Sequence, residues 1–386
     1  MMRSLFLAVL LLSSPISAFG QAKMPRVQIV FLTPADVDAP TGVSRRLTQV
    51  ADYTEAMLVK WMKAWDYPPA REQIFQRNAD GSVQVLFVKS PETLASGKFP
   101  LKDGNLSRKG KLLAMEKFKL PKTLDVWWVW VYVGDPPLKY SSYLGSGNAA
   151  AGGLSQVNYT NLPGEISVED KLASPLLKDL TLKGTIHEFG HALGLPHNGP
   201  LIKEDLGMPL MGATIANYRR VMKNREERGY VTAASAAILW KHPLFTGTAE
   251  RRYQIPKVEW HDLAVKNDRQ QRVAHLTGRI TSNVPAHSII VYDTAPDVRT
   301  QYFQKPYVAR VEKDGTFDIT ISEPVTVQAK GVLKVVACCE NGTMTGDGKK
   351  RGYGNGLSQS YAAEQHQSVN GLLPSYSSSE TFNGGW

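Results

Sequence analysis

The chain has 386 residues, of which 42% are hydrophobic and 21% are charged. This length exceeds a single ordinary core and the composition is that of a globular protein, so we expect two domains and exclude a disordered or membrane-embedded chain. The formal net charge is +10, but lysine and arginine are spread along the chain and no nucleic-acid motif is present, so we expect no nucleic-acid partner.

Residues 1–22 have the pattern of a secretory signal peptide. A basic start at Met1–Arg3 precedes an apolar run over Leu5–Leu12 and a small-residue region that ends near Ala18 or Ala22. The apolar run is too short to span a bilayer, and no cysteine follows it where a lipid would be attached. We therefore expect a secreted protein, extracellular or periplasmic, with no stable membrane anchor.

The next segment alternates between strand and helix patterns. Residues 27–32 and 83–88 are typical of strands, and 44–65 have the periodicity of a helix with Leu47, Val50, Met57, Leu58 and Trp61 inward. Residues 126–133 are apolar throughout and include three tryptophans. A strand that is covered on both faces has this composition, so we assign these tryptophans to the core.

A glycine-rich run follows at 145–153 and continues into Leu154–Val157. We expect it to form an edge strand of the sheet. A peptide substrate that lies extended along such an edge would gain main-chain hydrogen bonds.

The sequence His187-Glu188-Phe189-Gly190-His191 predicts a metal site. Positions i and i+4 of a helix share one face, so the imidazoles of His187 and His191 can reach one ion. Ser174-Pro175 and Thr181 are alternative starts for this helix, and either start leaves both histidines helical.

A turn after the helix is predicted to supply the third ligand. Gly194 is able to adopt the left-handed conformation that ends a helix, and the chain then returns His197 toward the ion. Three neutral nitrogen ligands leave the fourth position of Zn2+ to water, which distinguishes a catalytic site from a structural one. Glu188 is the candidate general base.

The motif from His187 to His197 resembles the zinc signature of metzincin metalloproteases, and its amino-acid sequence is most similar to that of the matrixin branch. The resemblance implies a methionine turn beneath the zinc. We assign Met211 to it, with Met208 as the second candidate. It also implies a metzincin-like domain with a twisted mixed sheet, over residues 23–250.

Three departures limit the resemblance. Ala213 stands where astacin-like and serralysin-like members place a tyrosine, and no cysteine precedes the first strand to act as a matrixin cysteine switch. Residues 143–161 lack the His/Asp cluster that holds a second zinc in matrixins, so we assign one metal.

Residues 212–218 are expected to form the wall of a neutral pocket, and helices near 217–228 and 232–240 are expected to close the domain.

Short apolar segments separated by turns follow from residue 256. They predict a small all-β sandwich over residues 256–340, with a turn at Asp314-Gly315, and then a Gly/Ser-rich irregular tail over 341–386. This region loosely resembles transthyretin-like sandwiches that are appended to secreted peptidases. Cys338 and Cys339 are adjacent and point to opposite faces of a strand, so we expect two separate thiols.

Together these patterns predict a secreted zinc metalloendopeptidase. It would bind a protein or peptide substrate in extended form, with Glu188 acting as base and then as acid. The alternatives are a zinc hydrolase of non-peptide amide bonds and a non-catalytic extracellular binding protein that uses the C-terminal sandwich. The natural substrate and the oligomeric state are left open by the sequence.

Overall fold

The computed structural model describes most of the chain between residues 24 and 361. The described residues are 24–101, 105–121, 125–135, 143–213, 229–249, 252, 254–268, 273–294, 302, 304–322, 331–345 and 357–361. The expected signal peptide at 1–22 and the expected helix near 217–228 lie outside these residues.

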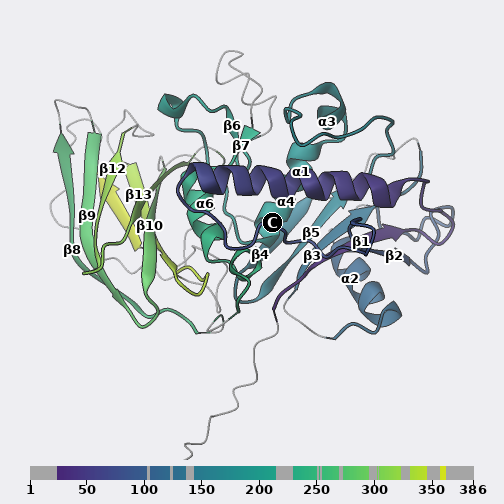
Figure 1. The fold of residues 1–386 in the computed structure, drawn as a ribbon, viewed down its shortest axis with the longest axis horizontal. Helices are drawn as coiled ribbons and strands as arrows, with labels where there is room; N and C mark the ends of the chain where they lie inside the picture. The colour runs from purple at the N-terminus through teal and green to yellow at the C-terminus, as the bar shows by residue number, and fades with distance from the viewer. Residues whose placement is uncertain are drawn as a thin grey trace, which may run out of the picture.

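A five-stranded mixed sheet forms the centre of the N-terminal half (Figure 1). Its strands run in the order β2-β1-β3-β5-β4, and every pairing is parallel except that of β4 with β5. The elements of this half are β1 (Val27–Thr33), α1 (Val43–Ala64), β2 (Val85–Lys89), α2 (Leu106–Lys117), β3 (Val126–Val131), β4 (Leu144–Asn148) and β5 (Gly152–Asn158).

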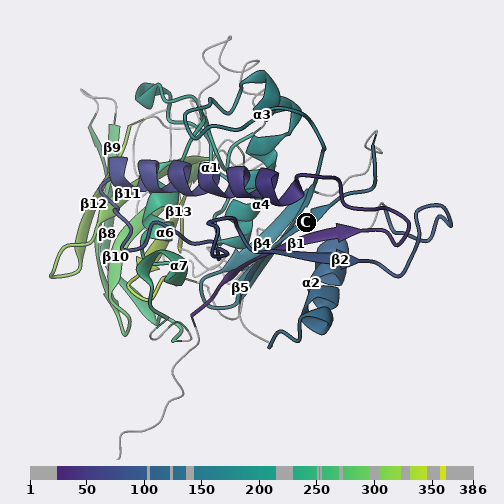
Figure 2. The same ribbon diagram turned by 45° about the vertical axis from the view of Figure 1, so that its right-hand side comes forward.

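Helices cover both faces of this sheet (Figures 1 and 2). On one face Phe31 and Trp128 belong to a core that includes α1 and α4 (Leu182–Ala192). On the opposite face Leu32 and Trp127 pack in a second core with α2. Every residue of β3 is buried, as the unbroken apolar run predicted.

The expected edge strand is divided between two strands. Only β4 lies at the edge, because it pairs with β5 alone among the described strands, whereas β5 lies inside the sheet between β3 and β4. The prediction was therefore right for Gly145–Asn148 and wrong for Leu154–Val157. The turn at 149–151 reverses the chain between the two strands.

Short elements link this sheet to the C-terminal half. They are α3 (Pro175–Asp179), α4, a 3-10 turn at Ile202–Glu204, β6 (Met208–Pro209), β7 (Gly229–Tyr230), α6 (Ala233–Trp240) and α7 (Pro243–Thr246). The helix expected at 232–240 is α6. The side chain of Thr232 caps it by accepting a hydrogen bond from the Ser235 amide.

The C-terminal half contains two antiparallel sheets, one of four strands and one of three. Their orders are β11-β10-β13-β14 and β12-β9-β8. The strands are β8 (Val258–Asp268), β9 (Val273–Ser282), β10 (Ala286–Thr294), β11 (Lys305–Arg310), β12 (Thr316–Ile321), β13 (Gly331–Cys339) and β14 (Leu357–Tyr361). Residues of both sheets share one hydrophobic cluster, to which Leu276, Val291 and Val335 belong.

Three details of this half bear on the sequence predictions. The turn at Asp314-Gly315 forms, with Gly315 at φ 86°, but it joins strands of different sheets. Strand β14 lies within the segment for which an irregular tail was expected, and it pairs with β13. Cys338 and Cys339 are buried thiols that no disulfide joins, as predicted.

The two halves of the molecule share one continuous core. Ile290 and Val336 of the four-stranded sheet pack in the same cluster as α1 and α6. At the same boundary the guanidinium of Arg310 lies 3.7 Å from the ring centre of Tyr67 and 4.3 Å from that of Trp240. Trp240 ends α6 and Tyr67 lies just after α1, so these cation–π contacts hold β11 against α6 and the segment that follows α1.

No helix in the described part of the chain is both long and apolar enough to cross a membrane.

Candidate metal centre

Helix α4 carries the candidate metal ligands, and its ends have identifiable causes. The chain uses both predicted starts for separate helices: Ser174 and Pro175 begin α3, whereas Thr181 precedes α4 with a left-handed φ of 51°. At the other end Gly194 has φ 92°. The Leu195 amide donates to Gly190 O and the Gly194 amide to His191 O, which is the Schellman ending.

The glycines of β4 and β5 allow the sheet to lie directly against the backbone of α4. A Cβ at Gly145 would lie 2.1 Å from Glu188 O, and one at Gly147 would lie 2.1 Å from Ala192 O. A Cβ at Gly153 would be even closer, at 1.9 Å from Ala192 O. This close approach is the physical reason for the glycine-rich run, and it places edge strand β4 beside the helix that carries His187 and His191.

Aromatic stacking fixes α4 against the sheet from within. The ring centres of Trp128 and Phe189 are 4.6 Å apart and nearly parallel, and Phe75 stacks on both of them. Because Phe189 follows Glu188 directly, this buried stack also fixes the segment that carries the candidate base.

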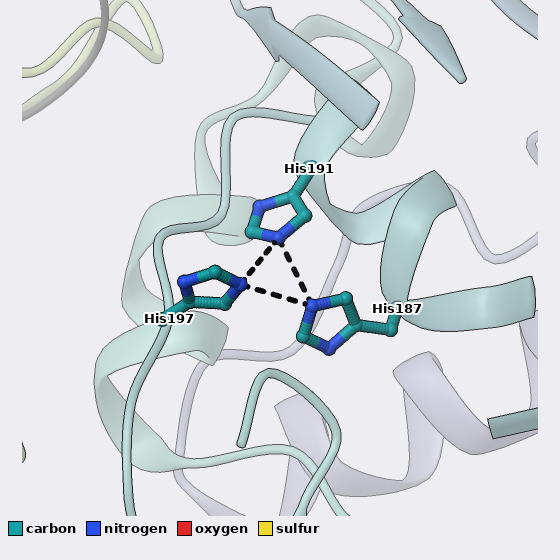
Figure 3. A group of neighbouring side chains, drawn as sticks. All are labelled: His187, His191 and His197. Carbon is teal, nitrogen blue, oxygen red and sulfur yellow. Dashed lines mark hydrogen bonds between the residues drawn. The ribbon is translucent and has the colours of Figure 1, made fainter. Parts of the chain in front are cut away.

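The three predicted histidines meet at one point (Figure 3). His187 and His191 project from α4, and His197 projects from the loop after the Gly194 turn. The three Nε2 atoms lie 2.9, 3.0 and 3.2 Å from one another. All three side chains are buried.

Hydrogen bonds on the far side of the rings determine what this cluster can bind. His187 Nδ1 lies 2.8 Å from Leu210 O, and His191 Nδ1 lies 2.7 Å from Leu195 O. A carbonyl accepts but cannot donate, so each Nδ1 carries the hydrogen and each Nε2 presents a lone pair. Lone pairs that converge in this way repel one another unless a cation lies between them.

The spacing of the donors fits a tetrahedral zinc ion. Nitrogen ligands at the usual Zn–N distance would lie about 3.3 Å apart, close to the separations of the three Nε2 atoms. Burial lowers the pKa of His187 well below its usual value, that of His191 to about 4, and that of His197 to about 3. The rings are therefore neutral at physiological pH, as metal ligands must be.

Glu188 lies beside this cluster in an environment that suits proton transfer. Burial raises the pKa of its carboxyl to about 7, and the positive charge of Lys183 opposes part of that rise. Its buried Oε2 atom receives no hydrogen bond from the described residues. A carboxyl group with a pKa near neutrality is able both to accept and to release a proton.

Met211 lies against α4 at Gly190, the residue before His191. A Cβ added at Gly190 would be 2.6 Å from Met211 Sδ, and Met211 itself is buried. Its carbonyl oxygen accepts a hydrogen bond from the Asn198 amide, next to His197. Met208, the second candidate, instead packs with Ala213 and Tyr302 in a separate small cluster.

Lys183 is a site residue that the sequence analysis missed. Its ammonium group is buried and donates to Gly212 O and to Ala213 O, both at 2.8 Å. Burial lowers its pKa to about 7. The missed signal was its spacing, because Lys183 precedes His187 by four residues and so shares the histidine face of the helix.

Two further residues reach the site from the segment between β10 and β11. The ring centre of Tyr302 lies 3.9 Å from that of His197. Gln304 is buried, its side-chain amide donates to His197 O, and its main-chain carbonyl oxygen accepts from the Gly199 amide at 2.7 Å. More than 100 residues separate these side chains from His197, so no local pattern indicates the contact.

Comparison with known proteins identifies the fold. No protein-family model matches the chain, and no curated protein matches it significantly. Solved structures do match: catalytically inactive OgpA from Akkermansia muciniphila, in complex with an O-glycopeptide (glycodrosocin) substrate, superposes with a TM-score of 0.64. Its sequence identity is 18%, and the match covers 89% of this chain and 93% of OgpA.

Wild-type OgpA in two crystal forms gives the same TM-score of 0.64 at 19% identity. These matches cover 89% of this chain and 93% or 94% of OgpA. Such coverage cannot be reached by the N-terminal half alone, so the likeness includes the C-terminal sheets. The chain is thus an α/β protein with the fold of OgpA, and a buried triad of histidines lies on its helix α4.

Proposed function

We propose that this protein is a secreted zinc-dependent peptidase. The observation that carries the proposal is the convergence of three Nε2 atoms, next to Glu188, whose Oε2 has no hydrogen-bond partner among the described residues. In this proposal His187, His191 and His197 hold one Zn2+, and Met211 forms the methionine turn. The matrixin-like sequence of the helix motif supports a metzincin-type site, while the overall fold resembles that of OgpA.

Bound zinc would supply Lewis-acid chemistry, which acidifies water and polarises the scissile carbonyl. The protein's own carboxylate handles the protons. Glu188 accepts the proton of the attacking water and then delivers it to the leaving nitrogen, which must leave as a neutral amine. A pKa near 7 allows Glu188 to perform both transfers at neutral pH.

Edge strand β4 supports an extended peptide as substrate. Its only described partner strand is β5, so its other edge is available for an added strand. The close packing of Gly145 and Gly147 on α4 brings this edge beside Glu188. A peptide paired with β4 would therefore pass the metal centre in a stretched conformation.

The likeness to OgpA supports a narrower substrate class, namely peptides that carry O-linked sugars. OgpA was solved with an O-glycopeptide, and the shared fold includes the C-terminal sheets. We propose that residues 23–250 form the peptidase domain, that 256–340 form a sandwich domain, and that 341–386 follow as a tail. In this arrangement both domains contribute to the substrate site.

The test measures zinc content and cleavage together. Purified protein is assayed on casein, on a mucin-type glycoprotein, and on the same glycoprotein after enzymatic removal of its glycans. We expect one zinc per chain, and cleavage that is lost on chelation and in Glu188→Gln, which should retain zinc. Because Gln cannot accept the proton, kcat should fall at least a hundred-fold.

The three substrates separate the alternatives. Cleavage of the glycosylated form alone supports a glycopeptide substrate, and equal cleavage of all three supports a general endopeptidase. Full activity in Glu188→Gln, or a chain that binds no zinc, would contradict the proposed function. A zinc-loaded chain that cleaves none of them but hydrolyses a non-peptide amide would be the alternative hydrolase.

A further inference from the structure

Tyr302, which lies between β10 and β11 in the chain, supplies an aromatic wall to the candidate metal centre. The ring of Tyr302 is tilted by 37° on the ring of His197, with centres 3.9 Å apart, and its centre lies 6.0 Å from that of His187. It also packs on Met208 and Ala213. Tyr302 thus lies between the third histidine and the loop that follows Met211.

Buried hydrogen bonds fix the position of Gln304. Gln304 follows Tyr302 by two residues. Its side-chain amide donates to His197 O, and its main-chain oxygen accepts from the Gly199 amide, so the two bonds lie on either side of Asn198. Gln304 is only 2% exposed. Because these bonds are shielded from water, they hold Gln304, two residues from Tyr302 in the chain, close to His197.

A phenol at this position combines two properties that the proposed reaction requires. The ring is only partly buried, so a substrate can approach it, and it lies against a ligand ring rather than away from the centre. A phenol, whose ordinary pKa is about 10, is protonated at neutral pH, so its hydroxyl is able to donate a hydrogen bond.

We propose that Tyr302 is a catalytic hydrogen-bond donor, whose hydroxyl donates to the oxygen of the scissile carbonyl as that oxygen becomes negative. This inference rests on the proposed peptidase function. A fixed donor aimed at developing charge stabilises the transition state more than the bound substrate, so its loss lowers kcat and leaves KM nearly unchanged. The C-terminal half of the chain then supplies part of the catalytic machinery itself.

The test compares Tyr302→Phe with the wild type on a peptide that the wild type cleaves. Phe keeps the ring contacts with His197 and Met208 and removes only the hydroxyl. We expect kcat to fall about 100-fold to 1,000-fold, KM to change less than two-fold, and zinc content and thermal midpoint to be unchanged. A phosphinate analogue of the same peptide, which carries the tetrahedral anionic centre, should bind at least ten-fold more weakly to Tyr302→Phe.

Tyr53→Phe is the matched control. The Tyr53 hydroxyl donates to the main-chain oxygen of Asp170, so this variant also loses a buried phenol bond but should keep its kcat. If Tyr302→Phe keeps the kcat and the analogue affinity of the wild type, the inference is overturned and the proposed function is left intact. If the wild type is no more active than Glu188→Gln, both the role of Tyr302 and the proposed peptidase function are contradicted.

Discussion

Met211 Sδ occupies the space that a side chain at Gly190 would need, since a Cβ built at Gly190 would lie 2.6 Å from this sulfur. The contact connects the middle of the HExxH motif to a loop 21 residues further along the chain. It explains why the residue before His191 is glycine, although glycine weakens a helix.

Gly190→Ala is expected to destabilise the protein by about 1–3 kcal/mol, because Met211 is buried and must move to admit the methyl group. The same displacement should weaken zinc binding, since Asn198, which is bonded to Met211 O, follows His197. Urea unfolding and zinc competition titrations measure the two effects.

Gly184→Ala on the same helix is the matched control for Gly190→Ala. Its Cβ would meet only the Tyr143 ring at 3.7 Å, an ordinary contact, so this variant should gain about 0.5–1 kcal/mol of stability. Equal effects of the two substitutions would show that helix propensity, and not the contact with Met211, decides the outcome.

Gly147→Ala should impair substrate binding through edge strand β4. The added methyl group would lie 2.1 Å from Ala192 O, so β4 must move away from α4. If the substrate pairs with β4, kcat/KM should fall about ten-fold or more, which corresponds to about 1.4 kcal/mol. Ser146→Ala, in the same strand, serves as the control; unchanged kinetics in Gly147→Ala would argue against a substrate on this edge.

Lys183→Met should shift the acid limb of the pH profile of kcat/KM to higher pH. The positive charge of Lys183 lowers the pKa of Glu188, so its removal raises that pKa above about 7 and the carboxylate becomes protonated earlier as pH falls. The Gly212 and Ala213 carbonyls also lose their buried donor, which should cost about 1–3 kcal/mol of stability.

The measurement for Lys183→Met is a kcat/KM profile from pH 5 to pH 9. Exposed Lys178, on α3, provides the control substitution Lys178→Met, which should leave the profile in place. A Lys183→Met profile that overlays the wild type would mean that Lys183 acts only through its hydrogen bonds.

His242→Asn should make the fold less sensitive to acid. His242 Nδ1 accepts from the Leu244 amide at the start of α7, and burial, with the charge of Arg252, lowers its pKa to about 3. Below pH 6.5 the unfolded chain binds a proton at this histidine that the folded chain does not, so stability falls as the pH is lowered.

The loss from His242 amounts to about 2 kcal/mol at pH 5 for one group with an unfolded pKa of 6.5. Asparagine is able to keep the helix cap without titrating. Between pH 7.5 and pH 5, the free energy of unfolding measured with urea should therefore decrease less for His242→Asn than for the wild type. The control variant is His261→Asn, at a partly exposed position of β8. An identical decrease in His242→Asn would contradict the assignment.

Local sequence patterns were sufficient for much of the fold. The periodicity of α1 and the apolar run of β3 each report on the environment of one element, and both were predicted within a few residues. The division of the glycine-rich run between β4 and β5, the pairing of β14 and the sheet change at Asp314-Gly315 were not predicted. Each depends on which strand lies alongside, and distant residues decide that.

The same distinction applies to the candidate site. The spacing of His187 and His191, with the turn at Gly194, placed three imidazoles within one short stretch, because the geometry of a helix and its Schellman ending is local. The sequence alone therefore determined the candidate ligands and the candidate base beside them.

Only the tertiary structure decided what surrounds these groups. Burial sets the pKa of Glu188 near 7, Lys183 joins the helix to the loop after Met211, and Tyr302 arrives from the C-terminal sheets. Burial and long-range contact arise from the packing of segments that are far apart in the chain, so no short stretch of sequence contains them.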